Sequence, residues 1–225
     1  MYPGLQAKTR PDQPAIVMAR SGDIVTYREL DERSNRLAHL LRAVGLRRGD
    51  HYAVFMENHP RYVECDAAGE RSGLYYTNIN SFLTAGELAY ILSNSRSRVL
   101  IASEARRAVA LAALQDCSDV ELCLIVDGPG WGERIKNLDE AEAAYPTTPV
   151  ADESLGAAML YSSGTTGQPK GVKRPLWDLP PTQPHPVFPG YVKHWRFREG
   201  MTYLMPAPNG RAAPSARSGS EGRSS

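Results

Sequence analysis

The residues between Ser162 and Val172 combine glycines, hydroxyls and one lysine in a pattern suited to binding an anion. Three glycines carry no Cβ, so backbone N–H groups can approach a bulky anion closely; they are Gly164, Gly167 and Gly171. Four hydroxyls lie in the same stretch, on Ser162, Ser163, Thr165 and Thr166. Lys170 adds a positive charge, which gains about 4 kcal/mol at about 4 Å from a phosphate oxygen when the effective dielectric constant is about 20. We interpret the stretch as a loop that holds a polyphosphate.

Two better-known motifs do not fit this stretch. A Walker A loop ends in Gly-Lys-Ser/Thr and leads into a helix, whereas here Pro169 precedes Lys170 and Gly171 follows it. Ser163 also lacks the Gly-x-Ser-x-Gly elbow of serine hydrolases. An ordinary surface loop rich in Gly, Ser and Thr has the same composition, so the order of the residue types is what favours a binding loop.

The chain before this loop alternates between helical and strand patterns. Two capping boxes, Thr26–Glu29 and Thr84–Glu87, predict helix starts. We expect helices over about 26–44, 58–72, 84–92 and 103–115, the last with Val109, Leu111 and Leu114 facing inward. We expect strands at 15–18, 24–25, 52–56, 74–76, 99–102, 122–126, 157–161 and 201–205, a surface lead-in over 1–23, and a loop at 78–80.

This alternation predicts an α/β fold with a mainly parallel sheet covered by helices. In such sheets ligands bind beyond the carboxyl ends of the strands. The stretch after Tyr161 follows an apolar run, so it lies where a ligand-binding loop is expected.

The composition argues against several other classes of protein. The net charge is +1, which favours neither nucleic acid nor an anionic membrane as a partner. Three sparse cysteines, Cys65, Cys117 and Cys123, predict buried cytoplasmic thiols rather than disulfides or a zinc site. No signal peptide or apolar run of bilayer length is visible, so we expect no membrane span and a cytoplasmic protein. No metal ligand is assigned, because scattered surface or core positions explain the histidines, which are His39, His51, His59, His185 and His194.

The string from Tyr161 to Val172 resembles the phosphate loop of the adenylate-forming (AMP-binding) ligases, which include acyl-CoA synthetases and peptide-synthetase adenylation domains. Three earlier segments, at 26–30, at 45–50 and at 68–80 together with 83–88, are similar to sequence blocks of the same family. The resemblance covers roughly residues 10–205 and is greatest to fatty-acyl-CoA synthetases.

The resemblance implies an ATP-dependent acid–thiol ligase. In this family a carboxylic acid attacks the α-phosphate of ATP, pyrophosphate leaves, and coenzyme A then takes the acyl group. By that resemblance Lys170 would bind the phosphates and offset charge on the departing pyrophosphate, with Mg²⁺ sharing that load. The other expected phosphate-binding residues are Ser162, Ser163, Gly164, Thr165, Thr166 and Gly167. The expected acid is a fatty acid.

The resemblance also divides the chain. Residues 1–208 correspond to part of an AMP-binding domain, with the phosphate loop at 161–172 and a proline-rich loop at 175–190. Residues 209–225 contain no aliphatic side chain larger than alanine and no aromatic one, which predicts a disordered, non-homologous tail. Relatives continue here into a nucleoside pocket and a lid, so we expect a ligase truncated by a frameshift near codon 208, with little or no activity alone.

Two other interpretations stay open. One is an adenylation module for amino acids or aryl acids, and the other is a non-catalytic fragment that binds phosphate or a partner. The acyl chain length and the oligomeric state are not predicted.

Overall fold

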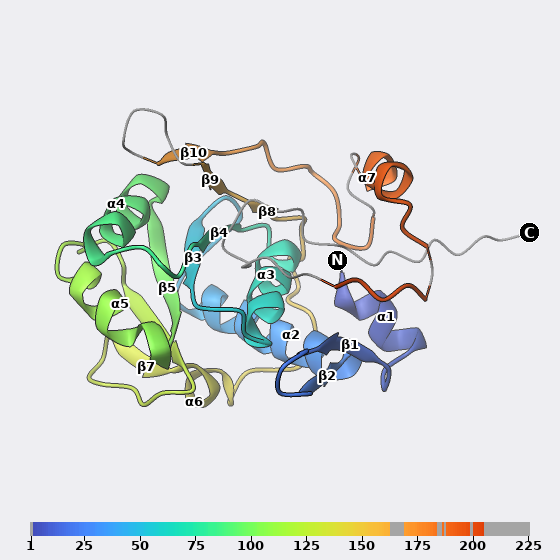
Figure 1. Cartoon of the computed structure of the whole chain (residues 1–225), viewed down its shortest axis with the longest axis horizontal. Helices are drawn as coiled ribbons and strands as arrows, with labels where there is room; N and C mark the ends of the chain where they lie inside the picture. The colour runs from blue at the N-terminus through green and yellow to red at the C-terminus, as the bar shows by residue number, and fades with distance from the viewer. Residues whose placement is uncertain (1, 163–168, 184–185, 187, 199, 205–225) are drawn as a thin grey trace, which may run out of the picture.

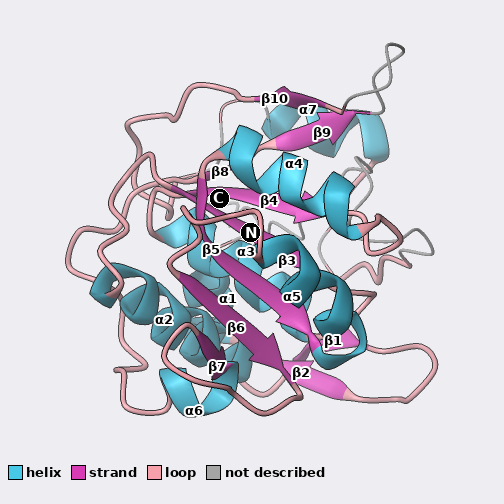
Figure 2. Ribbon diagram, turned by 90° about the vertical axis from the view of Figure 1, so that its left-hand side faces the viewer, coloured by secondary structure: helices cyan, strands magenta, loops and turns pink. Residues whose placement is uncertain are grey.

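The fold is built on one six-stranded sheet with helices on both of its faces (Figures 1 and 2). The computed structural model describes residues 2–162, 169–183, 186, 188–198 and 200–204. The expected disordered tail, 209–225, and the middle of the expected phosphate loop lie outside the described residues.

All five pairings within the large sheet are parallel, as the alternating pattern predicts. The strand order is β7-β6-β5-β3-β4-β8. The strands are β3 His51–Phe55, β4 Tyr75–Ile79, β5 Ser97–Ser103, β6 Leu122–Val126, β7 Ile135–Asn137 and β8 Ala157–Ala158. Every residue of β3 and β6 is buried, because helices cover both faces of a parallel sheet.

Side chains that alternate along β3 enter two separate cores. Tyr52 and Val54 pack with one cluster of buried residues, whereas Ala53 and Phe55 pack with the other. The first core is covered mainly by α2 Tyr27–Ala43, α3 Arg61–Arg71 and α6 Leu138–Glu142, and the second by α4 Ala85–Ser95 and α5 Arg107–Leu114. From β3 the chain passes through α3 to β4 on one side, and it later returns through α4 to β5 on the other side.

Both predicted capping boxes are confirmed. The Thr26 hydroxyl accepts from the Glu29 N–H at 3.2 Å, and the Glu29 carboxylate accepts from the Thr26 N–H at 2.8 Å. Thr84 and Glu87 repeat this arrangement at the start of α4. The predicted inward face of α5 is confirmed: Leu114 is buried, and the half-buried Val109 and Leu111 pack against the same core. Alanines 110 and 113 add buried contacts there.

The N-terminal segment contains a helix that the sequence patterns did not reveal. α1 spans Pro3–Thr9 and packs against α2, with a proline at the start where the missing N–H costs nothing. The strands predicted at 15–18 and 24–25 are confirmed as β1 Pro14–Val17 and β2 Ile24–Thr26, which pair antiparallel. Gly22, in the connecting turn, has a φ of 78°, which glycine adopts without strain.

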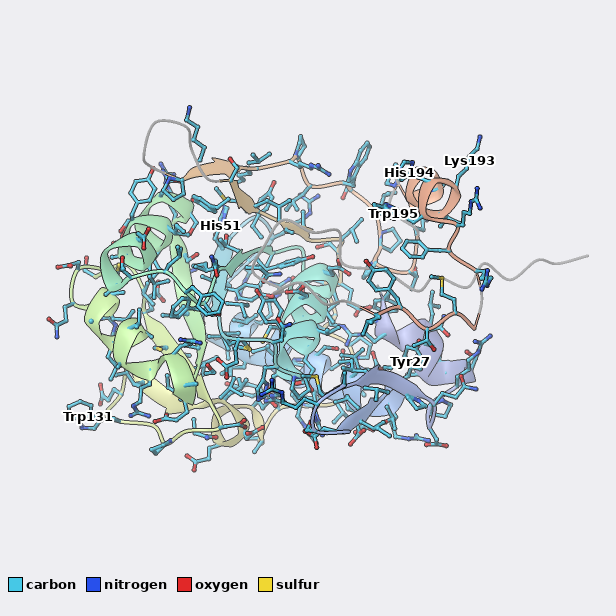
Figure 3. All side chains as sticks on the ribbon, viewed as in Figure 1. Tyr27, His51, Trp131, Lys193, His194 and Trp195 are labelled. Carbon is cyan, nitrogen blue, oxygen red and sulfur yellow. The ribbon has the colours of Figure 1, made fainter. Side chains whose placement is uncertain are left out.

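Three other predictions of local structure are wrong. The expected loop at 78–80 begins inside β4, where Asn78 pairs with Val54 and its side-chain NH₂ donates to Asp66 Oδ2 at 3.1 Å. A helix, α7 Phe188–Trp195, begins within the expected proline-rich loop (Figure 3). Residues 201–204 form no strand; instead Tyr203 contacts Phe197 edge to face, with ring centroids 6.1 Å apart.

The three cysteines are buried free thiols, as predicted. None of the helices in the described part of the chain has the length and apolar character of a bilayer-crossing segment.

Candidate phosphate-binding site

The strand expected at 157–161 is two short strands with different partners. Ala157 and Ala158 form β8, which pairs in parallel with β4 at the edge of the large sheet. Leu160–Ser162 form β9, which leaves that sheet and pairs antiparallel with β10 Lys170–Val172. The expected central, buried strand is therefore an edge strand followed by a hairpin, and the residues of β8 and β9 are half-buried or exposed.

The register of the hairpin sets Ser162 directly opposite Lys170. Opposite residues of an antiparallel pair have Cα atoms roughly 4.5–5.5 Å apart. Ser162 and Lys170 are thus held next to each other on either side of residues 163–169. These intervening residues include the Gly/Thr stretch that the sequence assigns to phosphate binding.

Of the predicted site residues, the structure describes Ser162 and Lys170. It brings them together where β9 ends and β10 begins, which we call the mouth of the hairpin, and both are exposed there. No ion pair joins Lys170 to any other residue that the structure describes. Ser163, Gly164, Thr165, Thr166 and Gly167 lie outside the described residues. The two described side chains are hydrogen-bond donors open to solvent, and this donor set fits a phosphate group.

Tyr161 anchors the hairpin to α4. Its hydroxyl donates to Asn94 Oδ1 at 2.6 Å, and its ring packs on the core under α4 and α5. Burial raises the pKa of Tyr161 to about 12, so the hydroxyl stays a donor at neutral pH. Gly171 lies opposite Tyr161, and a Cβ there would lie 2.6 Å from Met159 Cε and 2.9 Å from Tyr161 Cζ.

The segment after the hairpin is anchored to the amino ends of β3 and β4. Lys173 Nζ donates to His51 Nε2 at 2.9 Å and lies 4.3 Å from the centroid of the Tyr75 ring. His51 stacks on Tyr75 with ring centroids 4.7 Å apart, and the Tyr75 hydroxyl donates to the Arg174 carbonyl at 2.6 Å. Sequence reasoning missed this anchor, because nothing local links His51 to a lysine 122 residues away.

β8 is held in place by backbone contacts at Gly156. The Gly156 N–H donates to the Glu70 carbonyl at 2.9 Å. A Cβ on Gly156 would lie 2.1 Å from the Gly69 carbonyl oxygen and 2.5 Å from that of Leu74. Only glycine lets the chain enter β8 this close to the end of α3. The position of β8 in turn determines where the hairpin begins.

The carboxyl ends of the central strands carry a second polar group, which the sequence did not reveal. His59, after β3, lies with its Nε2 2.9 Å from Asp127 Oδ2, after β6. The Arg61 N–H donates to His59 Nδ1 at 3.2 Å, so the Nε2 proton points to the carboxylate. Ser103, at the end of β5, donates to Glu57 at 2.6 Å.

The described residues contain no group of three or more His, Cys, Asp or Glu side chains placed to hold a metal ion.

Comparison with known proteins decides the family. The family model described as "AMP-binding enzyme" matches residues 5–175, which is most of the chain. The chain belongs to this family. Its fold is thus that of an AMP-binding enzyme, as the resemblance implies.

Curated relatives of this AMP-binding protein are CoA ligases. The crotonobetaine/carnitine–CoA ligase of Escherichia coli is 30% identical over 207 residues, which is 86% of this chain and 38% of the relative. The ligase of the same name from Citrobacter koseri is 28% identical over 213 residues, 90% of this chain and 40% of the relative. The chain thus spans about two fifths of the length of these relatives.

Solved structures share the fold. An anthranilate CoA ligase, AuaEII, in complex with anthranoyl-AMP, matches with a TM-score of 0.69 at 24% identity. The match covers 76% of this chain and 33% of the ligase chain. A putative long-chain-fatty-acid CoA ligase from Rhodopseudomonas palustris matches with a TM-score of 0.71 at 22% identity. This match covers 88% of this chain and 48% of the ligase chain.

Proposed function

We propose that this chain supplies the triphosphate-binding part of an ATP-dependent CoA ligase, which activates a carboxylic acid as an acyl-adenylate and transfers it to coenzyme A. The observation that carries the proposal is the pairing of Ser162 with Lys170 across the mouth of the hairpin. This pairing fixes a hydroxyl and an ammonium group at the two ends of a Gly/Thr loop. Membership of the family supports ATP and coenzyme A as the two co-substrates.

In this proposal the protein positions the triphosphate of ATP and offsets its negative charge. Lys170 stabilises the negative charge that collects on the leaving pyrophosphate, and Ser162 donates to a phosphate oxygen. The remaining loop residues, Ser163 to Gly167, would add backbone and hydroxyl donors. ATP supplies the adenylyl group when it is bound, and a magnesium ion carried by the phosphates would share the charge.

A fatty acid is our proposed acid, and the cytoplasm our proposed location. The resemblance of residues 83–88 to fatty-acyl-CoA synthetases supports the first, and the absence of a bilayer-crossing helix among the described residues agrees with the second. Relatives named for carnitine and anthranilate show that the family accepts acids of different shape. The pyrophosphate-exchange rate of the whole protein with fatty, aryl and amino acids would identify the acid.

The direct test is a Lys170→Ala substitution. We expect it to weaken binding of ATP and of inorganic tripolyphosphate by roughly 1.5–3 kcal/mol, the range for a hydrogen bond to a charged group. That loss corresponds to a dissociation constant raised roughly ten- to hundredfold, measured by calorimetry.

Lys8→Ala is the matched control, since Lys8 is an exposed lysine on α1 and outside the hairpin. It should leave both affinities unchanged. If the Lys170→Ala variant and the unaltered chain bind ATP and tripolyphosphate equally well, Lys170 does not bind the phosphates.

A further inference from the structure

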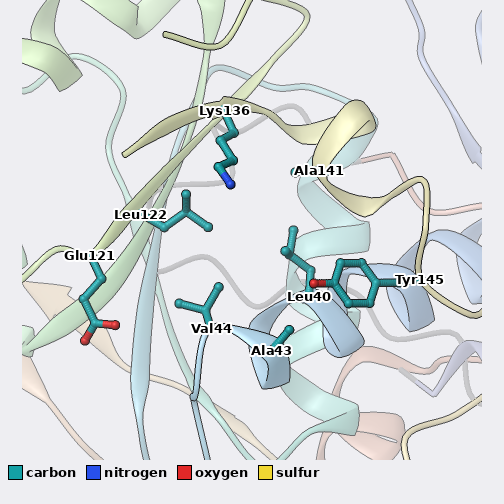
Figure 4. A pocket seen from close by; sticks show the side chains of 8 residues that line it. All are labelled: Leu40, Ala43, Val44, Glu121, Leu122, Lys136, Ala141 and Tyr145. Atoms are coloured by element: carbon teal, nitrogen blue, oxygen red, sulfur yellow. The ribbon is translucent and has the colours of Figure 1, made fainter. Parts of the chain in front are cut away.

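A pocket of about 380 Å³ opens on the face of the sheet that carries α2 and α6 (Figure 4). Leu40 and Val44 of the α2 end, Leu122 at the start of β6, and Ala141 of α6 supply apolar walls. Lys136 of β7 extends its ammonium group into the space, and Tyr145 lies at its side. The volume is at the small end of the range for small-molecule sites, roughly 300–1,000 Å³.

This pocket is separate from the candidate phosphate-binding site. It lies across β6 and β7, at one end of the strand order, whereas the hairpin follows β8 at the other end. Whatever binds in one site therefore does not contact the other.

The carboxylates around the pocket that the structure describes pair with arginines and not with Lys136. The Glu121 carboxylate, which also lines the pocket, accepts two bonds from Arg98, at 2.6 and 3.0 Å. The acidic residues of α6 at 139 and 142 pair with Arg61. Among the residues that the structure describes, no carboxylate pairs with Lys136.

The carbonyl end of α2 does not serve as the counterion either. The two carbonyls that follow α2, of Val44 and Gly45, accept from the Arg98 guanidinium at 3.4 and 3.1 Å. Arg98 also pairs with Asp50 Oδ2 at 3.2 Å, and no carboxylate among the described residues forms an ion pair with the Lys136 ammonium that extends into the pocket.

We propose that this pocket binds a small carboxylate amphiphile, with the carboxylate on Lys136 and a short hydrocarbon body against Leu40, Val44 and Leu122. A single ammonium group matches one negative charge, which favours a carboxylate over a polyphosphate. The buried leucines, 5% and 7% exposed, offer an apolar floor that a purely polar anion would not use.

The test is hydrogen–deuterium exchange of the full chain with octanoate, octanol and octylamine as probes, each titrated below its aggregation limit. We expect octanoate to protect peptides covering residues 36–46 and 135–146. Lys136→Met should raise the half-maximal octanoate concentration about tenfold, as for the loss of one charged hydrogen bond, and leave that of octanol unchanged. Lys136→Arg should restore octanoate binding.

Two further variants keep the result interpretable. Ala43→Leu fills the pocket from an exposed position of α2 and should weaken octanoate and octanol alike. Lys8→Met removes a lysine charge from α1, outside the pocket, and should change the binding of neither octanoate nor octanol. Equal octanoate protection in Lys136→Met and the unaltered chain, or octylamine binding as well as octanoate, would overturn the proposal. So would protection that ATP abolishes, because the probe would then lie at the proposed phosphate site.

Discussion

Lys170 and Lys173 lie three residues apart and have different surroundings. Lys173 donates to His51 and lies over the Tyr75 ring, so its charge is used to hold the segment after the hairpin. Lys170 lies opposite Ser162 at the exposed mouth of the hairpin, and no described residue forms an ion pair with it. Lys170, whose charge no described residue pairs, is therefore the lysine that we expect to meet a ligand.

The Lys173 contact makes the fold sensitive to acid. His51 is 7% exposed, and burial, followed by the charge of Lys173, lowers its pKa to about 4 from an ordinary value of 6.5. Arg96 lowers it further and Asp50 opposes the shift. Because folded His51 is neutral and unfolded His51 takes up a proton below pH 6.5, its contribution to stability is complete above pH 6.5 and is lost between about pH 6.5 and 4.

We expect this loss to be about 3 kcal/mol, because a difference of one between the pKa values of the folded and unfolded states is equivalent to about 1.36 kcal/mol. His51→Gln removes the titrating group, so the stability difference between the unaltered chain and the variant should shrink as the pH falls from 7 to 4. Urea unfolding at intervals across this range measures it. A stability difference that is independent of pH would show that His51 does not titrate in this way.

At the scale of elements, the entry into β8 decides where the hairpin lies. Gly156 brings the backbone against the carbonyls of Gly69 and Leu74, and β8 then pairs with β4 through bonds from Ala157 and Met159. The hairpin follows two residues later. Its position at the edge of the sheet is thus set by a backbone contact and not by the hairpin itself.

Gly156→Ala should destabilise the fold by about 1–3 kcal/mol, since the added methyl overlaps backbone atoms that cannot move aside easily. Urea unfolding measures the loss. Gly86→Ala is the matched control: nothing lies within 4 Å of its Cβ position in α4, and alanine should stabilise that helix by about 0.5–1 kcal/mol. Equal effects of the two substitutions would contradict the role of Gly156.

At the scale of the whole molecule, one buried arginine joins four segments. Arg71 of α3 is fully buried and donates to Asp31 of α2 at 2.8 Å and to Glu153, before β8, at 3.1 Å. Its guanidinium also lies 5.1 Å from the centroid of the Tyr2 ring. The N-terminal segment, the first two long helices and the approach to β8 are held by this group.

Arg71→Met should cost about 3–5 kcal/mol, because it leaves the half-buried Asp31 and Glu153 carboxylates and the buried Ser34 hydroxyl without their partner. Thermal and urea unfolding would both record the loss. Arg28→Met is the comparison, since the Arg28–Asp12 pair is 53% and 83% exposed and such pairs contribute roughly 0–1 kcal/mol. A cost near that of Arg28→Met would show that Arg71 is not the organising contact.

The sequence by itself determined the features that depend on near neighbours along the chain. Both capping boxes join residues three apart, and the apolar runs of β3, β5 and β6 read directly as buried strands. The alternation of these elements was enough to predict a parallel sheet. The order of residue types between 161 and 172 was enough to indicate the family, which the family match confirms.

The tertiary structure alone decided contacts between residues far apart. His51 meets Lys173, His59 meets Asp127, and Lys136 faces the end of α2, although no local pattern relates the members of these pairs. The split of 157–161 into β8 and β9 also depends on partners elsewhere, on β4 for one half and β10 for the other. Periodicity and capping act over a few residues, whereas these contacts exist only once the folded backbone has brought distant segments together.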